Sequence, residues 1–472
     1  MRAWKLSAGE LGAAFAAGSL TPERVLDETL ARLAVVQPQV NALVAMDQEG
    51  ARNAARASGL RWQRGLALSP LDGVVVTVKD NIPVAGLPCR WGSRLYENFM
   101  PTVDESPVAR LRAAGAVILG KTNVPEFTLQ GYTDNALHGA TRNPWDLALT
   151  PGGSSGGAVA AVACGIGPLA LATDGGGSIR RPASHTGVVG FKPSWGAVPR
   201  SEGLPEILPG IEVIGPIART VGDLLLAMEV IGVADGLGSR SGYAAEAARL
   251  SQPAQSVHPA PLRIACWRAI GNGPVDEEIL ASTDAAAQAL RELGHTVTEE
   301  AAPACIEAFN TGAWPVISST GLAAVLGGAD GNEAALTLSV LALLQRGRAL
   351  RATDLFAAQR QVRELSADMD RLFRRFDVVL TPAAAALPWP AHDTHPPMIA
   401  GTAVDARGHA VFTAFANAAG LPGLALPGMP SRSGLPIGFQ LIGPRGADAL
   451  LLALGLHYET LRPWHTRWPL DH

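Results

Sequence analysis

The strongest constraint on the fold is a set of short apolar runs that carry no charge and end abruptly. The run 74–78 consists of four valines and one threonine, with no alternation between apolar and polar residues. A strand of this kind is typical of a sheet that is buried on both faces, so helices must cover both sides. Similar runs occur at 116–119, 169–172, 262–266, 295–297, 378–380, 424–426 and 437–442.

Helical patterns separate these runs. Ser7 to Glu10 forms a capping box, and Thr21 with Pro22 predicts the start of a second helix. The other predicted helices cover 107–114, 155–164, 276–293 and a segment that begins near residue 447. Alternation of strands and helices along the chain predicts an α/β fold with one large, mostly buried sheet. We therefore expect a single domain over 1–472, with an N-terminal helical segment at 1–60.

The segment 234–261 has the weakest pattern. Alanine, serine, proline and glycine dominate it, and no apolar period is visible. Such a composition is typical of a loop. We interpret it as a surface linker or excursion.

Composition and charge narrow the classes of function. Hydrophobic residues make up 47% of the chain and charged residues 17%, which favours a large core over disorder. The net charge of −4 provides no basic surface for nucleic acid or anionic lipid. The first residues lack the apolar core of a secretory signal, and the longest apolar stretch, 158–173, is interrupted by glycine and proline. We expect a soluble, cytoplasmic protein with no nucleic-acid or membrane partner.

The cysteines predict no metal site. Cys89, Cys164, Cys266 and Cys305 lie far apart and form no C-x-x-C pair. This spacing favours buried or half-buried free thiols.

Lys79 is the first residue with potential chemistry, since it ends the uncharged run 74–78. A lysine at a strand end is commonly a solvated terminus. If it points inward instead, desolvation lowers its pKa and the neutral amine becomes a base.

Ser178 follows three consecutive glycines, Gly175 to Gly177, directly after the run 169–172. Glycines at a strand end allow successive N–H groups to converge on one point, where an oxyanion would be stabilised. A serine in the same turn is placed to attack the corresponding carbonyl carbon. A flexible glycine turn with no function is the alternative.

Ser154 precedes the predicted helix 155–164 in a loop of small residues. A serine at this place can cap the helix, and such a loop can also bind an anion. The nucleotide-binding pattern G-x-x-x-x-G-K-[ST] is absent from the sequence, which argues against a nucleotide site.

Taken together and in order, these segments resemble the amidase signature family. The resemblance is carried by PLDGVVVTVKDN (70–81), GKTNVPEF (120–127), RNPWDLALTPGGSSGGAVAAVACG (142–165), ALATDGGGSIRRPASHTGVVGFKPSWG (170–196), DVVLTP (377–382), FANAAGLPGLALP (415–427) and GLPIGFQLIG (434–443). It is densest over 70–196, which it marks as the catalytic signature core. The resemblance implies a central mixed β-sheet covered by helices on both faces.

The resemblance also implies catalytic roles. Lys79 is the expected base, Ser154 the relay after a cis peptide bond, and Ser178 the nucleophile that forms an acyl-enzyme. The N–H groups of Gly175, Gly176, Gly177 and Ser178 are the expected oxyanion hole. No metal ion or organic cofactor is implied.

Three neighbouring residues are expected to support this machinery. Ser155, Asp174 and Arg180 flank the two serines. For Asp174 and Arg180, a plain salt bridge or a solvated pair is an equally good interpretation.

Many relatives carry threonine or another small residue in place of Gly175, and His185 is interpreted as structural rather than pocket-lining.

A glutaminase-type A subunit of a tRNA-dependent amidotransferase is the main alternative within the family. In proteins of that type, an aspartate holds the α-amino group of glutamine at the position where this chain has Ala410. The stretch after Phe127 also differs from the pattern expected there. Both departures favour a free-standing hydrolase.

Two further alternatives lie outside that mechanism. Gly152 to Gly156 satisfies G-x-S-x-G, the nucleophile elbow of α/β-hydrolases, but Asn143, Pro144 and Pro151 disfavour the strand that an elbow requires. A non-catalytic, amidase-like binding protein is disfavoured because all three triad positions are filled.

Apolar and aromatic residues are the candidates for a substrate pocket, although ordinary core packing explains them as well. They are Phe127, Leu129, Gln130, Tyr132, Ile207, Trp314 and Trp389. Such a lining suits small or aryl carboxamides and anilides, with esters or carbamates (urethanes) as further substrates. A small-molecule amide is the expected ligand, and a homodimer is an expectation from the family alone.

Overall fold

Eleven strands form one sheet in the computed structural model, which describes residues 2–232, 261–327 and 333–470. The strands are β1 (Leu43–Met46), β2 (Val75–Lys79), β3 (Val117–Thr122), β4 (Leu169–Asp174), β5 (Val189–Lys192), β6 (Val213–Ala218), β7 (Arg263–Cys266), β8 (Thr296–Glu299), β9 (Val378–Pro382), β12 (Gly423–Pro427) and β13 (Gly438–Ile442). Their order across the sheet is β1-β3-β2-β4-β6-β5-β12-β13-β9-β7-β8. β2 is parallel to β3 and β4, β7 is parallel to β8 and β9, and the remaining neighbours are antiparallel. The expected α/β fold with a mixed sheet is confirmed.

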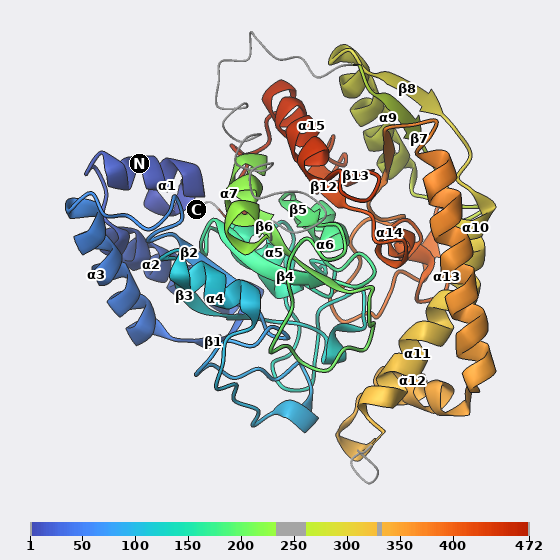
Figure 1. Ribbon diagram of the computed structural model, residues 1–472, viewed down its shortest axis with the longest axis horizontal. Helices are drawn as coiled ribbons and strands as arrows, with labels where there is room; N and C mark the ends of the chain where they lie inside the picture. The colour runs from blue at the N-terminus through green and yellow to red at the C-terminus, as the bar shows by residue number, and fades with distance from the viewer. Residues whose placement is uncertain (1, 233–260, 328–332, 471–472) are drawn as a thin grey trace.

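Helices surround this sheet (Figure 1). They are α1 (Ala8–Ala16), α2 (Pro22–Val40), α3 (Gln48–Gln63), α4 (Ser106–Ala113), α5 (Gly156–Cys164), α6 (Arg180–Thr186), α7 (Val221–Ile231), α9 (Glu277–Glu292), α10 (Ala304–Ala308), α11 (Trp314–Val325), α12 (Leu338–Ala349), α13 (Ala352–Leu372), α14 (Ala414–Ala418) and α15 (Asp448–Leu461). A small ribbon of β10 (Met398–Ile399) and β11 (Thr402–Ala403) stands apart from the main sheet.

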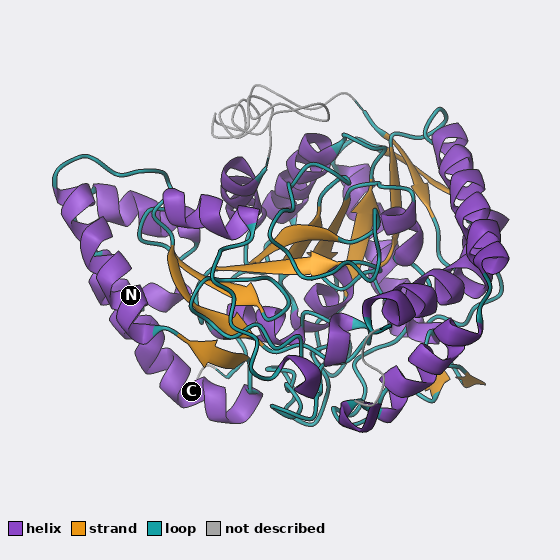
Figure 2. Cartoon of the chain, turned by 60° about the horizontal axis from the view of Figure 1, so that its bottom comes forward, coloured by secondary structure: helices purple, strands orange, loops and turns teal. Residues whose placement is uncertain are grey.

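The two faces of the sheet bury different side chains of the same strands. In β4, Leu169 and Leu171 join the cluster beneath α7 and α15, whereas Ala170 and Ala172 pack with α5 on the other face. Alternate residues of a strand point to opposite faces, so burial of all of them requires helices on both sides. Figure 2 shows this layered arrangement, with strands in the centre and helices around them.

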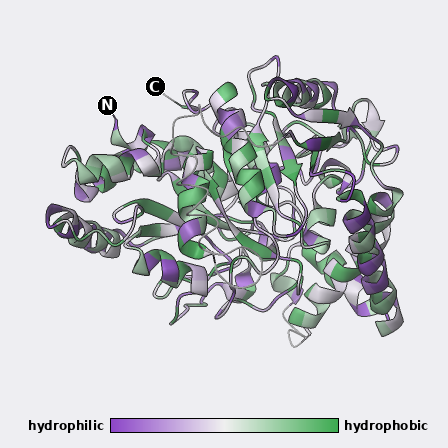
Figure 3. Cartoon of the chain, turned by 45° about the horizontal axis from the view of Figure 1, so that its top comes forward, coloured by the Kyte–Doolittle hydropathy of each residue, from purple (hydrophilic) through white to green (hydrophobic). Residues whose placement is uncertain are grey.

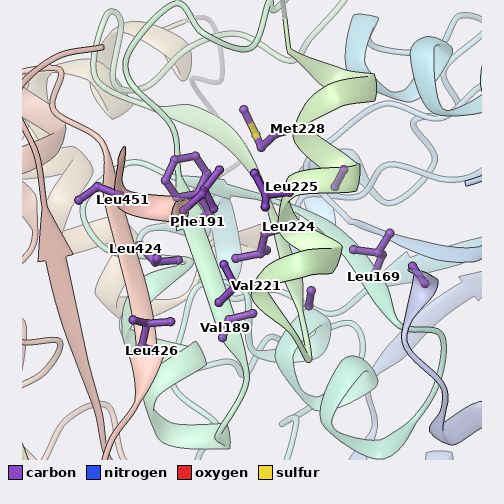
Figure 4. Close-up of a cluster of buried hydrophobic side chains, with 14 of the residues drawn as sticks. Leu169, Val189, Phe191, Val221, Leu224, Leu225, Met228, Leu424, Leu426 and Leu451 are labelled. Carbon is purple, nitrogen blue, oxygen red and sulfur yellow. The ribbon is translucent and has the colours of Figure 1, made fainter. Parts of the chain in front are cut away.

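The face beneath α7 carries a large aliphatic cluster. Figure 4 shows Phe191 and Leu424 from the sheet packed against Leu224 and Met228 of α7 and against Leu451 of α15. Figure 3 shows that hydrophobic residues follow the central strands, while hydrophilic residues concentrate on the peripheral helices. Across the described ranges, no helix unites the length and the apolar composition needed to cross a bilayer.

Both predicted helix starts near the N-terminus are confirmed. Ser7 Oγ accepts the amide of Glu10 at 3.1 Å, and Glu10 returns the contact by accepting the amide of Ser7 at 2.8 Å. Thr21 Oγ1 accepts the amide of Arg24 at 3.3 Å, with Pro22 as the first helical residue. These contacts satisfy N–H groups that a helix otherwise leaves unpaired.

The structure adds elements that the apolar pattern did not predict. The segment 1–60 is not wholly helical, because β1 lies between α2 and α3 and pairs with β3 at the edge of the sheet. β1 has only four residues, which is too short for a period to be recognised, and long-range pairing decides its conformation. β5, which also has four residues, was missed for the same reason, and β6 was missed because Gly215 and Pro216 interrupt its apolar run. The predicted linker 234–261 lies outside the described residues except for Pro261.

Close packing of α5 against a neighbouring loop provides a test of this architecture. A Cβ atom on Gly157 would lie 2.3 Å from Asn123 N and 2.6 Å from Ala42 O. We therefore expect Gly157→Ala to lower the free energy of unfolding by about 1–3 kcal/mol through overpacking of backbone atoms. Chemical denaturation measures this change.

The matched control is Gly222→Ala in α7, where the nearest atom to an added Cβ is 3.9 Å away. It should raise the free energy of unfolding, by up to about 1 kcal/mol, because alanine favours helix. Equal stability of the two variants would contradict the packing described here.

Candidate active site

The candidate residues meet where two parallel strands end side by side. β2 and β4 are neighbours in the sheet, with Val78 level with Leu171. Their carboxyl ends therefore reach the same edge, which brings Lys79 close to the turn after Asp174. α5 lies against both strands and begins at this edge, so the loop that carries Ser154 arrives at the same place. In open α/β sheets such an edge is the usual location of a ligand site.

Lys79 points into the protein and is fully buried. Its Nζ lies 2.9 Å from Ser154 Oγ, 2.9 Å from Thr173 Oγ1 and 3.1 Å from the carbonyl oxygen of Thr173. Burial lowers the pKa of this amine to about 7, because the charged form loses its hydration. The nearby charge of Glu212 acts in the opposite direction and limits the decrease.

Ser154 is also fully buried, and the Gly153–Ser154 peptide bond is cis. It does not cap α5, since the residue at the cap position is Ser155. Ser155 Oγ instead donates to the carbonyl oxygen of Thr173 at 3.3 Å. The loop before Ser154 contains no strand, so the elbow of an α/β-hydrolase is absent at this serine.

Ser178 stands at the end of the glycine turn and faces the large cavity described below. Gly177 has a φ of +112°, which a residue with a side chain rarely adopts. In the described part of the chain, no hydrogen bond joins the Ser178 hydroxyl to Ser154. The structure therefore connects Lys79 directly to Ser154 and places Ser178 on the next loop.

The predicted set of four amide donors needs one correction. The N–H of Gly177 donates to Asp174 Oδ1 at 2.7 Å and is already occupied. The N–H groups of Gly175, Gly176 and Ser178 have no acceptor among the described residues and remain available. The carboxylate of Asp174 takes the fourth donor because it needs hydrogen bonds to compensate for its own burial.

Asp174 and Arg180 form a salt bridge that is completely shielded from solvent, with 3.1 Å between Asp174 Oδ1 and Arg180 Nη2. Asp174 also accepts from the amide of Ile179 at 3.0 Å and from Asn417 Nδ2 at 3.0 Å. Burial alone would raise the pKa of Asp174, but the Arg180 charge and these hydrogen bonds hold it well below its usual range. The pair fixes the backbone of the glycine turn.

Arg181 links the two serine-bearing loops. Its Nη1 donates to the carbonyl oxygen of Gly176, and its Nη2 donates to that of Gly153 at 3.4 Å. One rigid guanidinium therefore binds the residue before Ser154 and a residue of the turn before Ser178. This contact fixes the distance between the loops.

A cavity of about 610 Å³ opens over the glycine turn. This volume suits a small organic ligand. Its wall includes Gly175, Gly176 and Ser178 together with Trp314 of α11 and Leu343 of α12. Trp314 lies directly against the turn, because a Cβ on Gly176 would come within 2.6 Å of the indole.

Most of the predicted pocket residues line this cavity, and two do not. Phe127, Leu129, Gln130, Ile207 and Trp314 all contribute to the wall. Tyr132 is a correction: it lies outside the wall, in the loop whose backbone packs against Gly153.

Trp389 and His185 form part of the surrounding core. Trp389 is buried with its ring 4.7 Å from His409 and 5.8 Å from His185. His185 Nε2 contacts the carbonyl oxygen of Ala386 at 3.2 Å, and burial lowers its pKa to about 4. The structural interpretation of His185 agrees with this position, whereas Trp389 is a correction because core packing takes its indole away from the cavity.

Sequence reasoning missed the charged residues of the cavity. Arg200 pairs with Glu105 at 2.8 Å and with Glu212 at 2.7 Å, and Arg407 lies over the Trp314 ring at 4.9 Å from its centroid. Residues 198–212 and 394–411 carry little regular structure, so no period predicts which side chains point inward. Only tertiary packing brings them to the glycine turn.

Comparisons with known proteins agree with this geometry. A family model described as Amidase matches residues 24–452. The A subunit of glutamyl-tRNA(Gln) amidotransferase from Chloroflexus aggregans is 35% identical, covering 97% of this chain and 96% of its own. An acylamidase of Rhodococcus erythropolis is 33% identical, covering 99% and 97%. The solved structure of a bacterial aryl acylamidase of the amidase signature enzymes matches with a TM-score of 0.87 at 29% identity, covering 98% and 97%.

The buried salt bridge beneath the turn provides a test. Asp174→Asn keeps the shape of the side chain but leaves the Arg180 charge without its counterion. We expect the free energy of unfolding to fall by about 3–5 kcal/mol, as is typical when one partner of a buried pair is removed. Urea denaturation measures the loss.

Asp377→Asn is the matched control. Asp377 meets Arg263 with a similar two-contact geometry, at 2.8 and 3.2 Å, but the side chains are 32% exposed for Asp377 and 53% exposed for Arg263. Solvent screens such a pair, so the control should lose much less stability. If both variants lost the same amount, the importance of burial at Asp174 would be refuted.

Proposed function

The chain belongs to the amidase signature family, whose members hydrolyse carboxamide C–N bonds, and we propose that Lys79, Ser154 and Ser178 carry out this reaction here. The proposed substrates are small or aryl amides and anilides. The observation that carries this proposal is the buried Lys79 amine in contact with Ser154, at the edge where the turn with Ser178 begins.

The three oxygen neighbours of Lys79 Nζ fit the three N–H donors of an ammonium or, equally, the two donors and one lone pair of a neutral amine. In the neutral form, the carbonyl oxygen of Thr173 and Thr173 Oγ1 accept the two N–H groups. The lone pair is then directed to the Ser154 hydroxyl. A pKa of about 7 leaves a large fraction of the amine neutral at physiological pH.

The proposed reaction begins with proton transfer along this chain. Ser178 gives its proton to Ser154 as its oxygen attacks the amide carbon, and Ser154 gives its own proton to Lys79. Hydrogen bonds of this kind often tighten only when substrate binds, which fits the absence of a Ser154–Ser178 contact in the described structure. The tetrahedral intermediate collapses when Ser154, supplied by Lys79, protonates the departing nitrogen and the C–N bond breaks.

The second half of the reaction uses water in place of Ser178. The relay takes a proton from water, the hydroxide attacks the Ser178 ester, and the acid leaves as Ser178 recovers its proton. In both halves we assign stabilisation of the oxyanion to the amides of Gly175, Gly176 and Ser178. Fixed donors in a dry site are worth more than the same donors in water.

The cavity lining supports aryl substrates. Trp91, Phe127 and Trp314 provide flat apolar surfaces around Ser178. An ester or a carbamate presents a carbonyl of the same geometry, so we include both as further substrates. The likeness to an acylamidase and to an aryl acylamidase points in the same direction.

The likeness to amidotransferase A subunits favours glutamine hydrolysis as a second candidate. Against it stands Ala410, which lines the cavity with a methyl group and has no charge to bind an α-amino group. We therefore place glutamine below aryl amides. The expectation of a homodimer stays a prediction, as does a small-molecule substrate without nucleic-acid or membrane partners.

A substrate panel with an active-site label tests the proposal. Wild-type enzyme should hydrolyse acetanilides and aryl esters or carbamates, leave glutamine nearly untouched, and react with a fluorophosphonate at Ser178. Ser178→Ala should lose about 10⁴-fold in kcat/KM and all labelling. Mass spectrometry of the labelled peptide identifies the residue. Glutamine as the best substrate, or label on Ser154, would refute the assignment.

The pH dependence tests the role of Lys79. Since only the neutral amine accepts a proton, kcat/KM should rise with pH around an apparent pKa of about 7. The Glu212 carboxylate stabilises the protonated amine, so Glu212→Gln should lower the pKa of Lys79 and move the acidic limb to lower pH. Glu206→Gln, which alters another carboxylate of the cavity wall, should leave the limb in place. A shift to higher pH in Glu212→Gln would contradict the mechanism.

A further inference from the structure

Charged groups are distributed unevenly around the cavity. The charged residues in its wall are Arg181, Arg200, Arg346, Arg407, Glu206, Glu212 and Asp405. Arg200 is neutralised locally, because Glu105 and Glu212 bind its guanidinium at 2.8 and 2.7 Å. Arg181, Arg346 and Arg407 have no carboxylate within ion-pair distance among the described residues, so three positive charges of the wall are not paired. Arg346 is exposed to solvent, and the two less accessible cations are Arg181 and Arg407.

Arg181 is the deeper of these two cations. It is only 3% exposed, and its Nε has no hydrogen-bond partner in the described structure. Its Nη1 contacts the carbonyl oxygen of Gly176 and Thr413 Oγ1, which are neutral acceptors. A buried cation of this kind is normally paired with an anion, because neutral partners compensate only part of its lost hydration.

Arg407 is less buried than Arg181. It is half-buried, and its guanidinium carbon is 4.9 Å from the centroid of the Trp314 ring. Asp405 accepts the backbone amide of Arg407 at 2.8 Å, but its carboxylate forms no ion pair with the guanidinium. The stacked guanidinium therefore keeps its N–H donors for another group, since a ring face uses none of them.

The two cations influence one another. Burial lowers the pKa of Arg181 to about 9, and the charge of Arg407 acts next in the same direction. Burial lowers the pKa of Arg407 to about 10. Loss of hydration is the main cause of both decreases in pKa.

Trp314 relates this pair to the reacting group. Its indole lies against Gly176 of the glycine turn and also stacks with the Arg407 guanidinium. Arg181 touches the same turn through the carbonyl oxygen of Gly176. A ligand in contact with Ser178 therefore has the two guanidinium groups within the same cavity.

We propose that Arg407, with Arg181 behind it, forms an anion subsite, and that the amide substrate carries a carboxylate on its acyl or amine portion. This inference rests on the proposed amide hydrolysis and names its substrate class. A guanidinium presents two parallel N–H groups that match a carboxylate, and a hydrogen bond to a charged group stabilises binding more than a neutral one. Arg407 selects the substrate and takes no part in bond cleavage.

Binding to an inactive enzyme tests the subsite without turnover. Calorimetry on Ser178→Ala compares N-phenylsuccinamate with the neutral N-phenylsuccinamide, and 4-acetamidobenzoate with 4-acetamidobenzamide. The first pair places the carboxylate on the acyl side and the second places it on the amine side. We expect the acid of at least one pair to bind about 10-fold tighter or more than its amide.

Variants of Arg407 in the Ser178→Ala background identify the group responsible. Arg407→Gln should abolish the preference for the acid. Arg407→Lys keeps the positive charge but lacks the two parallel N–H groups of a guanidinium, so it should retain part of the preference. Arg445→Gln is the matched control, since Arg445 also stacks on a tryptophan, 5.5 Å from Trp195, outside the cavity wall. Thermal unfolding of each variant verifies that it is folded.

Two results would overturn the subsite: equal affinity for acid and amide in both pairs, or a preference that survives in folded Arg407→Gln. Failure of the proposed function has a different signature. Wild-type enzyme would then hydrolyse no amide of the substrate panel, whereas Ser178→Ala would still prefer the acids. Hydrolysis of neutral anilides without any preference for acids would leave amide hydrolysis in place and refute the subsite.

Discussion

The arrangement of the site depends on burial of one amine without a counterion. Among the described residues, Lys79 Nζ forms hydrogen bonds only with the oxygens of Ser154 and Thr173, and no carboxylate lies within ion-pair distance of it. A permanently charged group in that position would be costly, and the neutral form is therefore favoured. The surrounding sheet makes this burial possible, because β2 lies in its interior with β3 and β4 on either side.

Sequence reasoning predicted the part of the fold that carries strong local patterns. The uncharged runs of β2, β4 and β13 are long enough to identify, and the caps of α1 and α2 rest on contacts between residues three positions apart. β1 escaped prediction because only its pairing with β3 makes its four residues a strand. The outer helices α10–α13 were not predicted individually, although the buried residues of α13, Ala358, Leu365, Met369 and Leu372, recur with a helical period.

The candidate site shows the same contrast between features with a local sequence signal and features that depend on tertiary packing. Lys79, Ser154 and Ser178 lie at a strand end, in a glycine loop and in a glycine turn, and these local signals marked them as candidates, whereas their proposed roles came from the resemblance to the amidase signature family. The commitment of the Gly177 amide to Asp174 was not predictable, since it depends on the rotamer of a buried carboxylate. Arg200 and Arg407 lie in irregular segments outside the signature core, and only packing brings them to the cavity.

Trp314 belongs to α11, which together with α12 and α13 forms a layer at the periphery of the molecule (Figure 1). The segment that contains these helices, 314–372, has no strand of the main sheet among its described residues, and it contains none of Lys79, Ser154 and Ser178. Substitutions on the cavity side of this layer can therefore reshape the ligand-binding wall without replacing a residue of the candidate triad. Such a division of labour makes α11 and α12 natural targets for directed diversification.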